Sequence, residues 1–166
     1  MESNKQADLM NKRQIKFIHG DESTLEEIKT LWQALNDHHF RHSINFKQDY
    51  SSITFEKRKA YLTKKAALGE LRVDQAIDKA TGLTIGYVVS SIDSEKTGEI
   101  DSFFVDEDYR GKGIGDALIK KALKWMDQKG AGAKIVEVAN GNEHAFAFYA
   151  KYGFLPRRTV LKQVRN

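Results

Sequence analysis

Residues 71–105 contain three strand-like segments in close succession, and this stretch limits most strongly what the chain can fold into. Apolar side chains alternate with polar ones over 71–77, β-branched and aromatic residues fill 83–92, and a third segment at 99–105 ends in Phe103-Phe104-Val105. Turn-forming residues at 79–82 and 94–98 separate the three. Strands joined by such short turns pair antiparallel. The sequence therefore predicts a central antiparallel sheet.

Helical and strand-like segments lie on both sides of this sheet in the chain. We expect a strand at 14–18, a helix from Ser23 through Leu35, a Lys-rich helix at 53–68 with a solvated face, a helix at 115–129, a strand at 134–139, a helix at 142–152 and a strand at 158–164. A strand that returns through a helix makes a crossover, so strands 99–105 and 134–139 should be parallel. The predicted fold class is α/β in α+β layers, with a mixed, mostly antiparallel central sheet and helices on both faces.

Composition narrows the class of protein. The 166 residues carry 27 Lys and Arg against 23 Asp and Glu, a net charge of +4, and contain no Cys. A cysteine acyl-enzyme, a disulfide framework and Cys-ligated metal are therefore excluded. No apolar run approaches the ~20 residues that span a bilayer, and the N-terminus has no apolar signal region. We expect a cytoplasmic protein without membrane partners, with a flexible lead-in at 1–12 and a single domain at 13–166.

The residues from Arg110 to Gly115 are the strongest candidate for a ligand site. Glycine occupies 111, 113 and 115 between a strand and a helix, with Arg110 and Lys112 among them. Glycine permits positive φ and close approach of a ligand to the backbone, and free N–H groups at a helix N-terminus bind anions. The pattern predicts a phosphate or diphosphate ligand.

Two common nucleotide motifs fit this loop poorly. The phosphate-binding Gly-x-x-x-x-Gly-Lys-Ser/Thr pattern is not present. The dinucleotide pattern Gly-x-Gly-x-x-Gly would need glycine at Asp116 or Leu118, and it normally opens a βαβ unit rather than following hairpins. The basic residues are interleaved with acidic ones, so nucleic-acid binding is not expected and is kept only as an alternative.

The loop and a later segment together resemble a known family. Arg110-Gly-Lys-Gly-Ile-Gly115 looks like the acyl-CoA motif of the GNAT family of N-acetyltransferases. The segment Asn142-x-x-Ala-x-x-x-Tyr149-x-x-x-Gly-Phe154 is similar to the segment that follows the fifth strand in that family. The resemblance covers residues 14–164, with its specific motifs at 99–154, and it implies the acyl-CoA N-acyltransferase fold.

The resemblance implies acetyl-CoA as cosubstrate and no metal. The backbone of the loop would hold its diphosphate, the free edge of a bulged strand would hold its pantetheine and polarise the thioester carbonyl, and Asn142 would hydrogen-bond the coenzyme arm. The residues implied in cosubstrate binding are Phe103, Phe104, Val105, Arg110, Gly111, Lys112, Gly113, Ile114, Gly115, Asn142 and Tyr149.

The resemblance also implies catalytic roles. Tyr149 would be the general acid that protonates the departing thiolate, which a phenol can do because its pKa of ~10 lies just above the ~8.5 of a thiol. Asp101, or Glu99 two residues before it on the same strand face, would take the proton of the amine. From the residues alone, Tyr149 is equally well a core aromatic residue, and the two carboxylates are equally well pocket-lining or solvated groups.

The predicted function is N-acetyl transfer from acetyl-CoA to a primary amine, on a small molecule or a peptide, by direct attack in a ternary complex. A non-catalytic acyl-CoA-binding or sensing module of the same fold is the alternative. His39, Phe40 and Tyr50 are predicted to contact the acceptor, whereas the spacing of His38 and His42 is read as a helix end rather than a metal site. Dimers are frequent in the family, so a homodimer is a candidate assembly.

Overall fold

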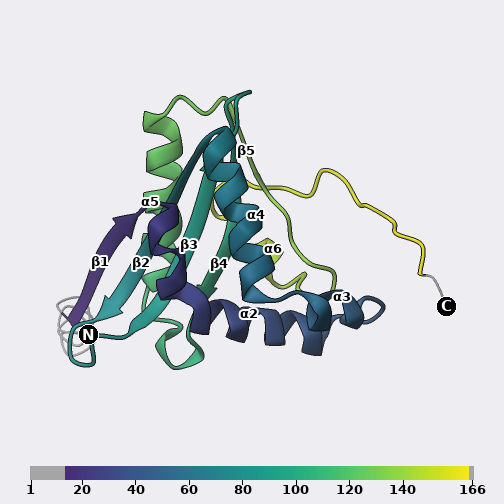
Figure 1. Cartoon of the computed structure of the whole chain (residues 1–166), viewed down its shortest axis with the longest axis horizontal. Helices are drawn as coiled ribbons and strands as arrows, with labels where there is room; N and C mark the ends of the chain where they lie inside the picture. Colours follow the sequence, from purple (N-terminus) through teal and green to yellow (C-terminus); the bar gives the residue numbers. More distant parts are fainter. Residues whose placement is uncertain (1–13, 165–166) are drawn as a thin grey trace.

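A computed structural model describes residues 14–164 of the chain, so the predicted lead-in at 1–12 lies outside the described residues. Its centre is a five-stranded sheet in the order β1-β2-β3-β4-β5 (Figure 1). The strands are β1 (Ile15–Gly20), β2 (Glu70–Asp78), β3 (Thr84–Ile92), β4 (Thr97–Val105) and β5 (Ala133–Val136). β1 to β4 pair antiparallel, and β4 pairs parallel with β5. The predicted mixed, mostly antiparallel sheet is confirmed.

The pairing of β4 with both of its neighbouring strands is irregular around Asp101. Its register with β3 steps from Ile100 opposite Ser90 to Ser102 opposite Val89, which leaves Asp101 as the extra residue of a β-bulge. Its pairing with β5 ends at Ile100 opposite Val136. From Asp101 to Val105, therefore, none of the described strands pairs with the edge of β4 that faces β5.

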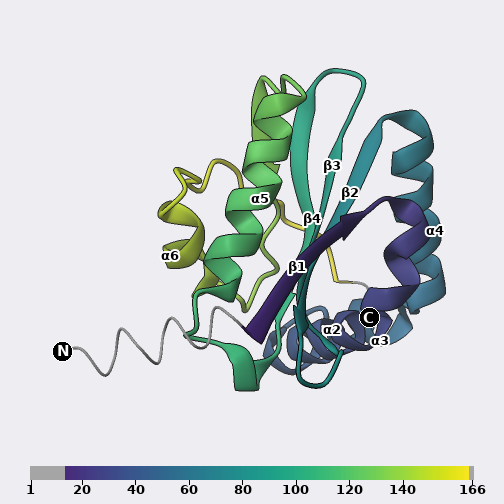
Figure 2. The same cartoon turned by 90° about the vertical axis from the view of Figure 1, so that its left-hand side faces the viewer.

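Helices cover both faces of the sheet (Figure 2). One face carries the 3-10 helix η1 (Glu22–Ile28) and the helices α2 (Lys29–His42), α3 (Lys47–Ser52) and α4 (Phe55–Leu68); the other carries α5 (Ile114–Gln128) and α6 (Ala145–Ala150). A short 3-10 turn, η2 (Glu107–Tyr109), lies between β4 and α5. None of these helices is long and apolar enough to cross a bilayer.

The sheet has one apolar core on each face, and the side chains of β3 alternate between the two. Val88 faces a cluster with Leu118, Ala122 and Met126 of α5, whereas Tyr87 and Val89 face a cluster with Leu25, Trp32 and Phe55, among others, from the helices on the opposite face. Because successive strand residues point to opposite faces, one apolar strand supplies both layers. β3 is accordingly buried along nearly its whole length.

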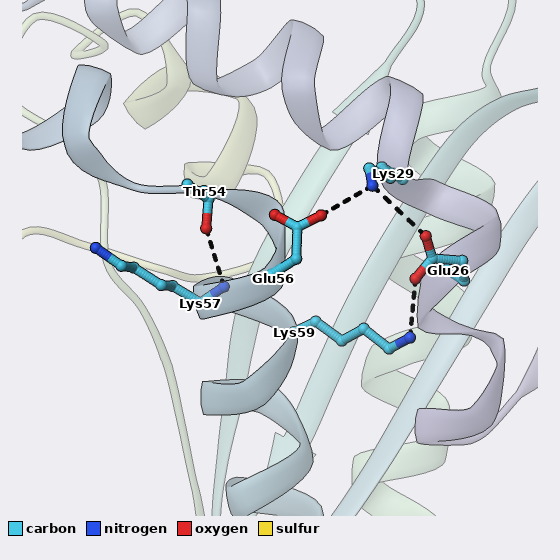
Figure 3. Close-up of polar contacts among 6 residues, drawn as sticks. All are labelled: Glu26, Lys29, Thr54, Glu56, Lys57 and Lys59. Carbon is cyan, nitrogen blue, oxygen red and sulfur yellow. Dashed lines mark hydrogen bonds and ion pairs between the residues drawn. The ribbon is translucent and has the colours of Figure 1, made fainter.

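Ion pairs at the surface connect α4 to η1 and α2 (Figure 3). Lys59 contacts Glu26 at 2.8 Å, and Lys29 contacts Glu56 at 2.9 Å. Thr54 caps α4 by accepting a hydrogen bond from the backbone N–H of Lys57. Exposed pairs of this kind are worth ~0–1 kcal/mol each, so they set the position of α4 more than they stabilise the fold.

Several predicted boundaries were wrong. The predicted strand at 158–164 is not formed; the segment is extended and exposed, and Val160 and Leu161 are 89% and 92% exposed. A strand needs a neighbouring backbone, and no described strand lies beside these residues. The helix predicted at 142–152 is limited to α6. The helix predicted from Ser23 begins as a 3-10 helix. Asp21 caps it by accepting a hydrogen bond from the backbone N–H of Ser23. α3 was not predicted.

Candidate active site

The glycine loop enters α5 with a backbone that only glycine adopts easily. Gly111 and Gly113 have φ values of +74° and +77°, and Gly113 is the N-cap of α5. A Cβ at either position would meet no atom within 4 Å. The space over these two residues is therefore open, and glycine is required here by the left-handed backbone rather than by crowding.

The loop presents backbone donors without internal partners. Among residues 14–164, no acceptor lies within hydrogen-bond reach of the N–H groups of Gly113, Ile114 and Gly115, and the first amide of the turn to be paired is that of Ala117, with the carbonyl of Gly113. These donors lie at the N-terminus of α5, a helix of 15 residues. The helix dipole adds positive potential there. The arrangement suits a diphosphate.

The charged side chains of the loop fold back onto it. Arg110 donates from Nε to the carbonyl of Val105 at 3.0 Å, and Lys112 donates from Nζ to the carbonyl of Asp108 at 3.0 Å. The guanidinium of Arg110 also lies over the ring of Phe104. Arg110 also lies 3.6 Å from Oε1 of Glu107, which offsets part of its charge. The open donors of the loop are the backbone amides.

Gly115 has a different role from the other two glycines. A Cβ at this position would lie 3.2 Å from Cζ of Phe103. The Phe103 ring stacks on Phe148 of α6 with the centroids 5.3 Å apart. Gly115 therefore lets the first turn of α5 approach an aromatic pair that joins β4 to α6.

A cavity of about 200 Å³ lies where β4 and β5 separate. Its walls come from α2, α3, α4, β4, β5, the segment after β5 and α6. The lining residues are Trp32, Leu35, Asn36, His39, Tyr50, Ile53, Arg58, Ile100, Asp101, Ser102, Phe103, Val136, Glu137, Val138, Ala139, Asn142 and Tyr149. Among the residues predicted from sequence, this cavity brings together Asp101, Phe103, Asn142 and Tyr149.

Other predicted residues lie outside this cavity. Glu99, Phe104, Val105 and the loop 110–115 do not line it. Of the three predicted acceptor contacts, His39 and Tyr50 line it and Phe40 does not. Phe40 instead lines a second, larger cavity of about 560 Å³ beside Phe104 and the carboxylates of the turn after β4.

Tyr149 is the aromatic hydroxyl of the cavity. The residue is 9% exposed, and burial raises the pKa of its phenol to about 12. Its ring makes edge contacts with Phe103, Phe148 and Phe154, while no hydrogen-bond partner for its hydroxyl is found within 14–164. Tyr149 thus keeps its proton at neutral pH and can donate it to a bound group.

Asp101 and Glu99 share one cation. Lys65 of α4 lies 2.5 Å from Oδ1 of Asp101 and 2.5 Å from Oε2 of Glu99. Burial raises the pKa of Asp101 even though hydrogen bonds with Lys65 and Ser91 oppose the shift. Burial also opposes the charge of Lys65, but hydrogen bonds to the two carboxylates outweigh it and raise the pKa of Lys65. The three groups form one coupled unit.

Arg58 was missed by the sequence analysis, which treated the Lys-rich helix as solvated. It donates from Nη2 to the backbone carbonyl of Asp101 at 2.5 Å and is half-buried. Arg58 and Lys65 are seven residues apart, two helical turns, so both lie on the face of α4 that packs on β4. Two cations at that spacing opposite the acidic pair of β4 were the signal available in the sequence.

The histidines gather where α2 ends near α6. The His38 ring lies 4.2 Å from that of His42 and 5.9 Å from that of His144. His39 packs against Tyr50, and burial, reinforced by His38 and His42, lowers its pKa to about 4. Within 14–164, no three His, Asp or Glu side chains are arranged to hold a metal ion.

A bulged strand, a neighbouring strand that separates from it and a helix start with open backbone donors are arranged here as in the acyl-CoA N-acyltransferase fold. Residues 32–154 match the family described as the Acetyltransferase (GNAT) family. The chain belongs to this family.

Similar proteins agree with that assignment. An uncharacterized N-acetyltransferase of Methanocaldococcus jannaschii is 37% identical over 90 residues, which are 49% of this chain and 39% of that protein. A putative acetyl transferase from Pyrococcus furiosus has 25% identity and a TM-score of 0.66, over 90% of this chain and 100% of that one. An aminoglycoside N-acetyltransferase solved in complex with CoA has 19% identity and a TM-score of 0.63, over 92% and 95% of the two chains. The matches to curated relatives span about two fifths of their length or less.

Proposed function

We propose that this protein transfers an acetyl group from acetyl-CoA to a primary amine by direct attack in a ternary complex. The observation that carries the proposal is the row of unpartnered amides at Gly113, Ile114 and Gly115. It lies at the start of the helix that follows the bulged strand, and the same strand leads into the cavity that Tyr149 lines. The loop proposed to bind the diphosphate follows β4, and Tyr149 of α6, the proposed proton donor, lines the cavity beside the same strand.

Acetyl-CoA supplies the acyl group as a thioester. The loop amides would bind its diphosphate, with Arg110 and Lys112 adding positive potential, and Asn142 would hydrogen-bond the coenzyme arm. The unpaired edge of β4 near Phe104 and Val105 would hold the pantetheine and donate to the thioester oxygen. Fixed donors at such an oxygen stabilise the charge that develops there.

The protons move at two positions. The amine must lose a proton before its lone pair attacks the carbonyl carbon, and we assign this proton to the Asp101–Glu99 pair. The side chain of Asp101 is 1% exposed to solvent, whereas the side chain of Glu99 is 25% exposed. Water would therefore relay the proton to the pair through Glu99. As the C–S bond breaks, Tyr149 gives its phenolic proton to the thiolate.

Binding and turnover test the proposal separately. Acetyl-CoA is titrated into the protein by calorimetry, and release of the CoA thiol is then followed over a panel of primary amines. We expect saturable binding and amine-dependent thiol release. Binding without release from any amine would indicate an acyl-CoA-binding module instead, and no binding of acetyl-CoA would remove the proposal entirely.

A further inference from the structure

The charged groups of the cavity do not all have partners. Three charged residues line it: Arg58, Asp101 and Glu137. The carboxylate of Asp101 is neutralised by Lys65. Among the described residues, neither Arg58 nor the exposed Glu137 forms an ion pair. The lining therefore carries one unpaired cation from α4 and one unpaired anion from the segment after β5.

Arg58 is well placed to bind an anion. Its guanidinium makes one hydrogen bond, to the carbonyl of Asp101, and otherwise lies over the ring of Tyr61 at 5.3 Å from the centroid. A guanidinium has five N–H donors in a planar fork, so most of them remain available. A half-buried cation without a counter-ion is unfavourable, and a carboxylate is the partner that the fork fits best.

The rest of the lining is uncharged. Trp32, Leu35, Tyr50 and Ile53 form an apolar and aromatic wall. His39, on the same side, is neutral near pH 7 because burial lowers its pKa to about 4. With a single exposed carboxylate, this cavity has no excess of negative charge to attract a molecule that carries several ammonium groups.

We infer that the acceptor is a small amino carboxylate, with its carboxylate held by Arg58 and its ammonium drawn toward Glu137 before it is deprotonated. The inference rests on the proposed function and names the substrate class of the same site. In the reaction, the new N–C bond forms as the C–S bond of the thioester breaks. The first ammonium proton goes to the Asp101–Glu99 pair, and the Tyr149 proton goes to the thiolate. The second proton of the attacking nitrogen is lost as the amide forms and restores the Tyr149 phenol.

Matched amines with and without the carboxylate test the inference. Phenylalanine is compared with phenethylamine, and lysine with cadaverine, by thiol release at saturating acetyl-CoA. We expect kcat/KM to be at least about 30-fold higher for the amino carboxylate of at least one pair, because a site built for a charged group rejects the analogue that lacks it. In Arg58→Met this ratio should fall to near one, and Arg58→Lys should retain part of it.

The controls separate this inference from a merely structural role of Arg58. If Arg58 only held the bulge of β4, Arg58→Met would lower kcat/KM equally for both members of a pair, and that result would overturn the inference. Lys57→Met, on an exposed neighbour in α4, should leave the ratio unchanged. Acetyl-CoA affinity and the thermal midpoint show whether each variant is folded. If Arg58→Met does not fold, the ratio measured in Arg58→Lys still tests the inference.

Two outcomes with the parent protein are also distinct. Thiol release from both members of every pair at similar rates would overturn the inference and leave the proposed function standing. An absence of release from every amine would overturn the proposed function, and the inference with it.

Discussion

Lys65 and Asp101 form a 2.5 Å ion pair between α4 and the bulge of β4, and the Asp101 side chain is almost fully buried. No other cation lies within ion-pair distance of this carboxylate among residues 14–164. The pair therefore fixes the helix that carries Arg58 to the strand that borders the cavity.

Removal of the Lys65 ammonium should destabilise the fold. Lys65→Met leaves a buried carboxylate without a counter-ion, which typically costs ~3–5 kcal/mol; partial exposure of Lys65 places the expected loss near ~3 kcal/mol. Urea unfolding at pH 7 measures it. Lys64→Met, on the exposed side of the same helix, is the control and should change stability by less than ~0.5 kcal/mol. Equal effects of the two substitutions would contradict a buried pair.

His39 should make stability depend on pH. Its folded pKa of about 4 lies below the ordinary 6.5, so between these values the unfolded chain binds a proton that the folded chain does not. The contribution is fully present above pH 6.5 and is lost as the pH falls toward 4. We expect His39→Phe, which keeps a ring against Tyr50, to lose less stability than the parent between pH 7 and 4.5. Replacement of the exposed His19 with Asn should leave the parent's slope unchanged.

The Tyr149 hydroxyl should matter for turnover and not for cosubstrate binding. Tyr149→Phe keeps the ring contacts and removes only the proton donor, so kcat should fall by about 100-fold, within the range of a lost general acid, while acetyl-CoA affinity stays within about twofold. Because burial raises the pKa of this phenol to about 12, its deprotonation should not appear in rate profiles below pH 10. Tyr152→Phe, which removes a hydroxyl that bonds Asp116, is the matched control. Parental turnover in Tyr149→Phe would exclude Tyr149 as the acid.

Gly113 should be needed for cosubstrate binding rather than for folding. Gly113→Asp adds bulk and negative charge where the diphosphate is expected, and acetyl-CoA affinity should fall by at least about 100-fold. Gly82 has a similar positive φ, +72°, and equally open surroundings in a hairpin turn. Gly82→Asp should therefore cost comparable strain, ~1 kcal/mol, without loss of affinity. Calorimetry checks both, and retained affinity in Gly113→Asp would mean that the diphosphate binds elsewhere.

The sheet was predictable because its signals are local. Alternation in β2, β-branched and aromatic residues in β3, and the short turns between β2, β3 and β4 predicted these strands, and the crossover rule made β5 parallel. The segment at 158–164 also contains β-branched residues, yet strand formation depends on a neighbouring backbone that a residue pattern does not specify. α3, only six residues long, left no period to detect.

The site was predictable in part for the same reason. The glycine loop and Tyr149 belong to contiguous motifs, so the resemblance to the family singled them out as candidates. Arg58 reaches Asp101 across 43 positions of the chain, and its contact depends on how α4 packs on β4. The composition of a helix shows that it is basic, while the choice of which cations face inward is made by tertiary packing.

Seven of the seventeen residues that line the cavity lie between Trp32 and Arg58, whereas the glycine loop joins β4 to α5. The segment that carries Arg58 is thus separate in the chain from the loop proposed to bind the cosubstrate. Grafting residues 29–58 of this chain onto a related scaffold would transfer Arg58 and the apolar wall beside it, and the recipient would still bind its cosubstrate through its own glycine loop.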